Sequence, residues 1–372
     1  MANILDYLKW RGDLSFETSA FNEIDSLLFC QLAYLNLDGL ITADRQAEPI
    51  PLPLLADMFA NASDYKIRRR LGPPISPKTN ELLPAMANCR RYAGTSLSCY
   101  VDRVDAGTQV QFSALYIHTG NGEDYIAFRG TDDTVVGWKE DFLMSVDTVP
   151  AQLEAVDYIQ YVAERSASPL RIGGHSKGGN LAVYGASFCR PEIRRRIVAV
   201  YNNDGPGFEG SVLSDPAYRD MVGKIKTFVP QSSVVGMLLG HEEPYTVVRS
   251  TQKGLLQHDA FSWQVMRDKF VYLDSVTDGS RFIDRTLKDW IAGMNAEQRS
   301  KFIDAVFGLL EANDITTLSE LSTDRLRRSG SILKYIGGTD GETRRLLRQS
   351  IQQLLRSARE NLNLFYKKGR PV

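Results

Sequence analysis

Residues 172–180 read Ile-Gly-Gly-His-Ser-Lys-Gly-Gly-Asn and contain the spacing Gly-x-Ser-x-Gly, with Ser176 at its centre. In this pattern the serine lies on a sharp turn between a strand and a helix, where side chains two residues to either side would clash. The turn exposes the hydroxyl at the N-terminus of the helix, where the helix dipole and free N–H groups favour a developing anion. The motif therefore predicts that Ser176 is a nucleophile.

A second motif lies upstream of Ser176 and makes a resemblance to known enzymes specific. Residues 127–131 read Ala-Phe-Arg-Gly-Thr, and Trp138 follows within a Trp-x-x-Asp sequence. Together with Gly-His-Ser-x-Gly-Gly, this pattern resembles the class 3 (fungal-type) lipases of the α/β-hydrolase superfamily over residues 110–265. The resemblance implies that the backbone N–H groups of Thr131 and Lys177 form an oxyanion hole.

His175 and Trp138 lie within these motifs, and we expect both side chains to contribute to substrate binding. The whole chain also resembles an uncharacterised bacterial family of lipase-like proteins. The matching segments are residues 3–14, 174–182, 203–208, 230–236 and 257–259. This second resemblance supports the fold and implies no particular substrate.

A nucleophilic serine needs a base at neutral pH, and the chain contains four histidines. His118 precedes the nucleophile in the sequence, and the side chain of His175 is expected to point away from Ser176. His258 follows the last expected strand of the core, which agrees with the order Ser, acid, His of this fold. We therefore predict that His258 is the base. His241, in a Gly-His-Glu-Glu sequence expected to be an exposed loop, is the alternative.

The acid of the triad is absent from its expected place. Class 3 lipases carry it in an Asp-x-Val-Pro-like loop, and the corresponding residues 230–236 contain no carboxylate. Asp204 follows the strand after the nucleophile helix, where pancreatic-type lipases of the same superfamily place their acid. A local turn with Gly205 is the alternative for Asp204, because Asp-Gly is a strong turn signal. Asp259 is a poor candidate, since adjacent side chains such as His258 and Asp259 seldom face each other.

Two basic features have both a structural and a functional interpretation. The side chain of Lys177 is expected in water on the first turn of its helix, with attraction of an anionic substrate group as the alternative. Residues 344–372 carry eight basic side chains and one acid, together with an apolar stripe. We expect a helix docked on the body of the protein with its basic face in water. Weak contact with an anionic membrane surface is the alternative.

Hydrophobic patterns indicate helices near both ends of the chain and strands in the middle. The expected strands are residues 98–101, 110–118, 125–128, 170–173, 197–201, 225–229 and 245–248. The expected helical segments are residues 1–40, 151–165, 180–188, 283–291, 301–310, 326–336 and 344–364. Residues 119–122 read Thr-Gly-Asn-Gly and predict a hairpin turn.

The alternation of strands and helices predicts an α/β-hydrolase core with a mostly parallel central sheet flanked by helices. We expect three parts. Residues 1–96 form an N-terminal helical and cap segment, residues 97–280 form the core, and residues 281–372 form a C-terminal helical extension.

Composition excludes several other classes of protein. The chain has 372 residues, a hydrophobic fraction of 43% and a formal net charge of -1, so it shows no bias towards nucleic acid. Its four cysteines lie far apart and contain no zinc signature. The sequence has neither a secretory signal nor a transmembrane stretch, and we expect a cytoplasmic protein.

These patterns together predict hydrolysis of a carboxylic ester, either a small molecule or a lipid, through an acyl-serine intermediate. No metal or cofactor is implied, and the oligomeric state is left open. Thioesterase, amidase or acyltransferase chemistry on the same triad is one alternative. A catalytically silent fold that binds a ligand or another protein is the other, because the expected loop lacks its acid.

Overall fold

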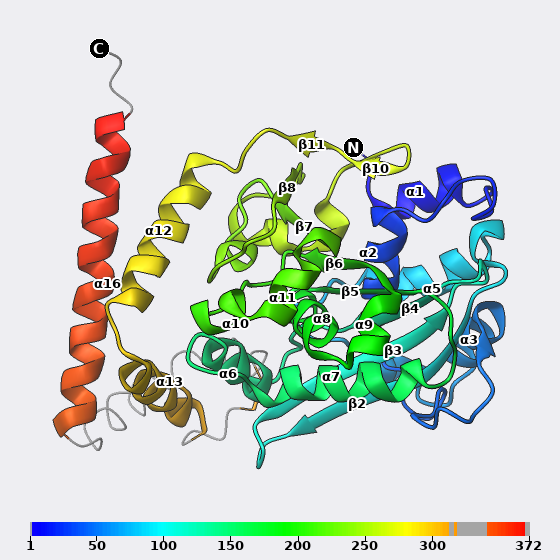
Figure 1. The fold of residues 1–372 in the computed structure, drawn as a ribbon, viewed down its shortest axis with the longest axis horizontal. Coiled ribbons are helices and arrows are strands. Elements are labelled where there is room, and N and C mark those ends of the chain that lie inside the picture. Colours follow the sequence, from blue (N-terminus) through cyan, green and yellow to red (C-terminus); the bar gives the residue numbers. More distant parts are fainter. Residues whose placement is uncertain (1, 312–315, 318–340, 369–372) are drawn as a thin grey trace.

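The fold is built on one large sheet that carries helices on both faces (Figure 1). A computed structural model describes residues 2–311, 316–317 and 341–368. In these ranges nine strands pair in the order β1-β2-β3-β4-β5-β6-β7-β8-β11. They are β1 Ile50–Pro51, β2 Ser96–Asp105, β3 Val110–His118, β4 Asp124–Phe128, β5 Leu170–His175, β6 Ile197–Asn203, β7 Ile225–Pro230, β8 Tyr245–Val248 and β11 Tyr272–Leu273. Two further strands, β9 Val265–Met266 and β10 Lys269–Phe270, form a small hairpin.

The expected mostly parallel sheet is in fact mixed. Strands β4 to β8 pair in parallel, whereas β1 to β4 and β8 with β11 pair antiparallel. One cause is local: the turn predicted at residues 119–122 joins β3 to β4 as a hairpin, with His118 opposite Asp124. The protein is therefore a mixed α/β structure in which the parallel half of the sheet carries the predicted nucleophile. All seven expected strands are present.

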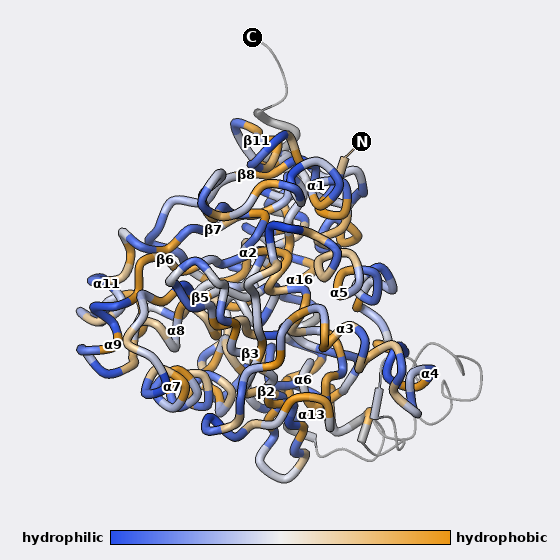
Figure 2. The backbone as a smooth tube through the Cα atoms, turned by 90° about the vertical axis from the view of Figure 1, so that its right-hand side faces the viewer, coloured by the Kyte–Doolittle hydropathy of each residue, from blue (hydrophilic) through white to orange (hydrophobic). Residues whose placement is uncertain are grey.

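Helices from distant parts of the chain cover the two faces of the sheet. Helix α2 (Glu23–Leu32) packs on β4, β5 and β6, and its residues from Ile24 to Leu32 are all buried. Helices α7 (Pro150–Ala163) and α8 (Lys177–Phe188) cover the opposite face. Figure 2 shows hydrophilic and hydrophobic residues mixed along α7, as expected for a helix with one face in water. The two helices predicted on this face are confirmed.

The remaining helices of the first 221 residues are short and flank these layers. They are α1 Ile4–Arg11, α3 Leu52–Ala60, α4 Tyr65–Arg68, α5 Thr79–Ala87, α6 Val135–Leu143, α9 Pro191–Arg196, α10 Gly210–Ser214 and α11 Pro216–Met221. The helical pattern expected over residues 1–40 is thus divided into α1 and α2. Each of these two helices begins at an asparagine, Asn3 or Asn22, that forms a capping box.

The C-terminal helices are α12 Asp278–Ala292, α13 Ala296–Glu311 and α16 Gly341–Lys368. Helices α12 and α16 pack along each other at one side of the molecule (Figure 1). The indole of Trp290 donates to the Ser350 carbonyl at 2.9 Å, and the Asn361 amide donates to Asp289 at 2.7 Å. Three of the four helices predicted here are confirmed, and the fourth, over residues 326–336, lies outside the described residues.

The basic face of α16 is turned away from α12. The side chains of Arg344, Arg345, Arg348 and Arg359 are exposed, whereas Leu346 is buried. Helix α16 is thus docked on α12 and α13 with these four arginines in water, whereas the side chains of residues 367, 368 and 370 lie outside the described residues. Contact with a membrane surface stays a prediction. Across the described ranges, every helix is too short or too polar to span a lipid bilayer.

A buried ion pair ties the N-terminal segment to the edge of the sheet. The guanidinium of Arg91 donates to both oxygens of Asp25 at 2.7 and 2.5 Å, and both side chains are 0% exposed. Tyr92 donates to the same carboxylate at 2.7 Å. Arg91 also donates to the carbonyls of Leu14 and Ser19. Because Asp25 lies on α2, this one arginine fixes the helix that covers the parallel strands.

Replacing Arg91 with methionine should lower the free energy of unfolding by about 3–5 kcal/mol, because it leaves the Asp25 carboxylate buried without its cation. Urea denaturation followed by tryptophan fluorescence measures the loss. Lys9→Met is the matched control: its ion pair with Asp6 is exposed, and its removal should change stability by less than about 1 kcal/mol. Equal losses in the two variants would contradict this account of the N-terminal segment.

Candidate active site

Ser176 lies on a strained turn between β5 and α8. Its φ of 59° and ψ of -136° fall in a region that non-glycine residues rarely occupy. A Cβ added to Gly174 would overlap the backbone of Gly178, and a Cβ added to Gly178 would overlap the Phe128 carbonyl. The Ser176 N–H donates to the Asn203 carbonyl of β6 at 3.0 Å, which holds the turn against the sheet. The strand–turn–helix context expected for the motif is present, and Ser176 is partly exposed.

The structure brings Asp204 and His258 together at the same end of the sheet. Asp204 follows β6 with a φ of 53°, and its side chain is 1% exposed. Its Oδ2 lies 2.7 Å from Nδ1 of His258. Asp204 also lies in a turn with Gly205, but the Gly205 N–H donates to the Asn202 side chain at 2.9 Å. Asn202 therefore shapes the turn and leaves the Asp204 carboxylate available to the histidine.

Residues 230–236, the loop that lacks the expected carboxylate, supply hydrogen-bond donors to Asp204. The hydroxyl of Ser233 donates to Oδ1 of Asp204 at 2.5 Å, and the N–H of Gly236 donates to the same oxygen at 3.1 Å. With His258 on Oδ2, the buried carboxylate has three donors. Sequence reasoning missed Ser233 and Gly236. The signal for them was that residues 230–236, where class 3 lipases carry their acid, contain glycine and serine residues and no carboxylate.

His175, the residue before Ser176, binds the backbone of His258. Its Nε2 lies 2.8 Å from the His258 carbonyl, and the two imidazole rings are 4.6 Å apart. Burial, and then the nearby His258, lower the pKa of His175 well below its usual value, so the ring is neutral. With Nε2 protonated to donate to the carbonyl, Nδ1 accepts from the Tyr34 hydroxyl at 3.0 Å. Substrate contact by His175 stays a prediction, since both ring nitrogens already have protein partners.

Tyr34 links the nucleophile turn to the strand that precedes Thr131. Its buried hydroxyl accepts the N–H of Gly130 at 3.1 Å and lies 3.2 Å from the His175 carbonyl. Burial raises the pKa of Tyr34, so the phenol stays protonated and can donate. Sequence analysis did not identify Tyr34, which lies 96 residues from Gly130 and carries no motif.

The two residues expected to form the oxyanion hole belong to segments that adjoin the serine. A Cβ added to Gly130 would lie 2.8 Å from the Cβ of Ser176, so Thr131 follows a segment in direct contact with the nucleophile. The Thr131 hydroxyl donates to Oδ2 of Asp141 at 2.5 Å, which fixes its orientation. Lys177 is the first residue of α8, where backbone N–H groups have no partner within the helix.

Trp138 has its own packing contacts on α6. Its indole donates to the Asp132 carbonyl at 3.1 Å, and its ring packs with Val135, Ile303 and Phe307. The side chain of Trp138 therefore lies at the contact of α6 with α13. Substrate binding by this residue stays a prediction.

Both expectations for the Lys177 side chain are wrong. The side chain is 1% exposed, and its Nζ donates to Glu140 at 2.9 Å and to the Gln111 carbonyl at 2.7 Å. Glu140 also accepts the N–H groups of Gln111 and Ala151 at 3.1 and 2.9 Å. The cation is therefore engaged in a buried ion pair beneath the site and cannot attract a substrate.

The other two histidines are paired with carboxylates away from Ser176. His241 was expected in an exposed loop, yet its side chain is 10% exposed and its Nδ1 lies 3.0 Å from Glu243. His118 lies 3.0 Å from Asp124, at the opposite end of β4 from the nucleophile. Of the four histidines, His258 is the one that the described contacts place on the buried Asp204.

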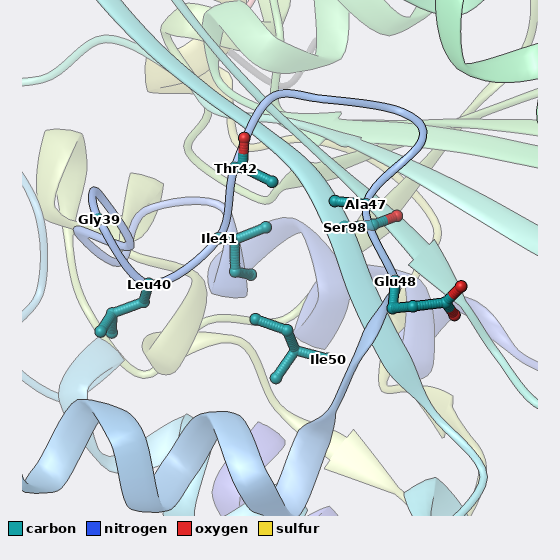
Figure 3. A pocket seen from close by; sticks show the side chains of 8 residues that line it. All are labelled: Gly39, Leu40, Ile41, Thr42, Ala47, Glu48, Ile50 and Ser98. Atoms are coloured by element: carbon teal, nitrogen blue, oxygen red, sulfur yellow. The ribbon is translucent and has the colours of Figure 1, made fainter.

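A pocket of about 520 Å³ lies apart from these residues. It is lined by Ile41, Ile50, Ser98 and neighbouring side chains at the edge of the sheet near β1 and β2 (Figure 3). It includes none of the predicted site residues. In the part of the chain that the structure describes, no group of three His, Cys, Asp or Glu side chains could hold a metal ion.

A family model described as Mbeg1-like matches residues 86–308, which include Ser176, Asp204 and His258. No curated protein matches the chain.

Asp141, which accepts from Thr131, should make stability depend on pH. Burial raises its pKa to about 6, although Lys177 and the Thr131 hydroxyl act in the opposite direction. An acid whose folded pKa is raised contributes stability below its unfolded pKa, near 4, and loses it as pH rises through 6. Asp141→Asn should therefore be more stable than wild type at about pH 8, by on the order of 2–3 kcal/mol.

This advantage should shrink several-fold at about pH 4, where the folded protein already carries a neutral Asp141. Urea denaturation at the two pH values measures it. Asp57→Asn, at an exposed position on α3, is the control and should show no pH-dependent difference from wild type. The same stability change at both pH values for Asp141→Asn would disprove the raised pKa.

Proposed function

This chain belongs to the Mbeg1-like family, a lipase-like family, and we propose that it is a serine hydrolase that cleaves a carboxylic ester through an acyl-serine intermediate. We also propose that its sheet is of the α/β-hydrolase type, on the evidence of the strand order and of the places of the serine, the acid and the base. Five parallel strands, β4 to β8, carry the strained serine turn after β5. The acid follows β6 and the base follows β8, which is the chain order of that fold.

The observation that carries the proposal is the convergence of three distant segments. The side chain of His175, adjacent to Ser176, binds the backbone of His258 at 2.8 Å. The imidazole of His258 in turn binds the buried Asp204 at 2.7 Å through Nδ1. This leaves Nε2 of His258 as the nitrogen that exchanges protons with substrate and nucleophile.

In the proposed reaction, Ser176 attacks the ester carbonyl while Nε2 of His258 accepts the hydroxyl proton. Asp204 binds the Nδ1–H and stabilises the imidazolium that forms. The N–H groups of Thr131 and Lys177 stabilise the oxyanion. His258 then protonates the leaving alcohol, and a water molecule activated by the same nitrogen hydrolyses the acyl-serine.

The arrangement of the acid favours an enzyme over a catalytically silent fold. The silent alternative rested on a loop without its carboxylate. Asp204 supplies a carboxylate from the neighbouring strand, and Ser233 and Gly236 of that loop orient it. A buried acid with three donors, one of them a histidine bound by the residue that precedes a strained serine, is an arrangement that a binding protein does not need.

A fluorophosphonate probe should label the wild-type protein covalently, because its phosphorus accepts attack from an activated serine. Labelling, read by intact-protein mass spectrometry, should disappear in Ser176→Ala. Far-UV circular dichroism controls for folding of the variant. Absence of labelling in well-folded wild-type protein would refute the proposed activity.

Asp204→Asn should lower kcat/KM for p-nitrophenyl butyrate by about 10³–10⁴, since an amide cannot stabilise the imidazolium of His258. Asp259→Asn is the matched control: this carboxylate adjoins His258 in sequence but accepts the Phe261 N–H at 3.0 Å. It should change kcat/KM by no more than a few fold. A near-normal rate in Asp204→Asn, or a larger loss in Asp259→Asn, would show that the acid is assigned to the wrong residue.

A further inference from the structure

His241 lies in a buried cluster whose partners are all acceptors. Its Nδ1 is 3.0 Å from Oε1 of Glu243, and its Nε2 is 3.0 Å from the carbonyl oxygen of Gly236. Glu243 is 0% exposed and also accepts from the hydroxyls of Thr227 and Tyr218 at 2.6 and 2.7 Å. Neither a carboxylate oxygen nor a carbonyl oxygen can donate to a ring nitrogen.

The protonation state of His241 follows from these partners. Although burial opposes it, the hydrogen bonds from His241, Thr227 and Tyr218 lower the pKa of Glu243 to about 2, so this carboxylate is ionised. A neutral imidazole would direct a lone pair at one of its two acceptors. Both contacts can be hydrogen bonds only when the ring carries two protons. With both hydrogen bonds formed, His241 is therefore an imidazolium, paired with Glu243 beneath residues 230–236, here called the acid loop because Ser233 and Gly236 in it bind Asp204.

The ring also joins the two segments that form the surroundings of Asp204. Its Nε2 binds the carbonyl of Gly236, whose own N–H donates to Oδ1 of Asp204 at 3.1 Å. Its Cδ2 faces Gly207, where an added Cβ would lie 3.0 Å away. Gly207 belongs to the turn that begins at Asp204, and Phe208 in that turn pairs with Gly240 through two backbone hydrogen bonds.

We propose that His241 is a positioning residue for the acid of the triad: its charged ring holds Gly236 so that the loop directs its donors at Asp204. The kinetic effect expected of this role rests on the proposed function, whereas the positioning of Asp204 does not. The groups that face the ring are Glu243 directly and Asp204 through Gly236. Tyr218 and Thr227 act on the ring through Glu243. His241 exchanges no proton with the substrate.

The test is His241→Gln, which is neutral and can satisfy one of the two acceptors at most. With p-nitrophenyl butyrate, kcat should fall ten- to a hundredfold while KM stays within about twofold, because a misplaced Asp204 acts mainly on the charged transition state. His118→Gln is the matched control, since it removes the same kind of histidine–carboxylate pair at the far end of β4. It should leave kcat and KM within about twofold of wild type.

Proton and nitrogen NMR of histidine-labelled protein provides a readout that needs no catalysis. The wild type should show His241 with both ring nitrogens protonated, His175 with one, and a low-field Nδ1–H proton of His258 bound to Asp204. That low-field resonance should shift or broaden in His241→Gln and stay in place in His118→Gln.

The outcomes separate this inference from the proposed function. A protein that the fluorophosphonate does not label, but whose His258 resonance moves in His241→Gln, loses the proposed activity and keeps the positioning role. A protein that is labelled, and in which His241→Gln changes neither kcat nor the His258 resonance, overturns the positioning role alone. A neutral His241 ring in the wild type, or an equal loss in His118→Gln, overturns it as well.

Discussion

Burial of the Asp204 carboxylate is the constraint around which the rest of the site is arranged. An ionised carboxylate inside a protein costs several kcal/mol unless donors replace its water. Here the donors are the Ser233 hydroxyl, the Gly236 N–H and the His258 imidazole, which come from two separate loops. The need to satisfy this one anion therefore brings both loops together at the carboxyl ends of β6 and β7.

Each of these loops is fixed by contacts of its own. The loop that carries His258 is held by the neighbouring Gln257. The side chain of Gln257 accepts the Ser232 N–H at 2.8 Å, and its backbone carbonyl accepts from the indole of the fully buried Trp263 at 2.9 Å. The acid loop is held by His241 and by its backbone pairing with the turn at Phe208. Ser232 lies in the acid loop, so the two loops are also bound directly to each other. Such a network keeps donor and acceptor in place before any substrate arrives.

The sequence was sufficient for the features that depend on local patterns, and insufficient where distant side chains meet. The Gly-x-Ser-x-Gly spacing identified the turn at Ser176, and the Thr-Gly-Asn-Gly signal identified the hairpin between β3 and β4. Polarity misled us at Lys177 and His241, because a charged residue next to glycines is typical of an exposed turn. Lys177 is buried because α8 packs on the sheet beside α7. His241 is largely enclosed because its ring lies against the buried Glu243. Local periodicity cannot reveal a partner 37 residues away, such as Glu140 for Lys177.

Tyr34 shows how far the site extends beyond the segment that carries the motifs. The family model begins at residue 86, yet this phenol from the end of the α2 region binds both Gly130 and His175. Helix α2 itself covers the face of β4, β5 and β6 and is held there by the buried pair of Asp25 and Arg91. The N-terminal residues therefore act as a structural layer that supports the turn at Ser176. The sheet ends carry the proposed catalytic groups, and the first helices determine how firmly those ends are held.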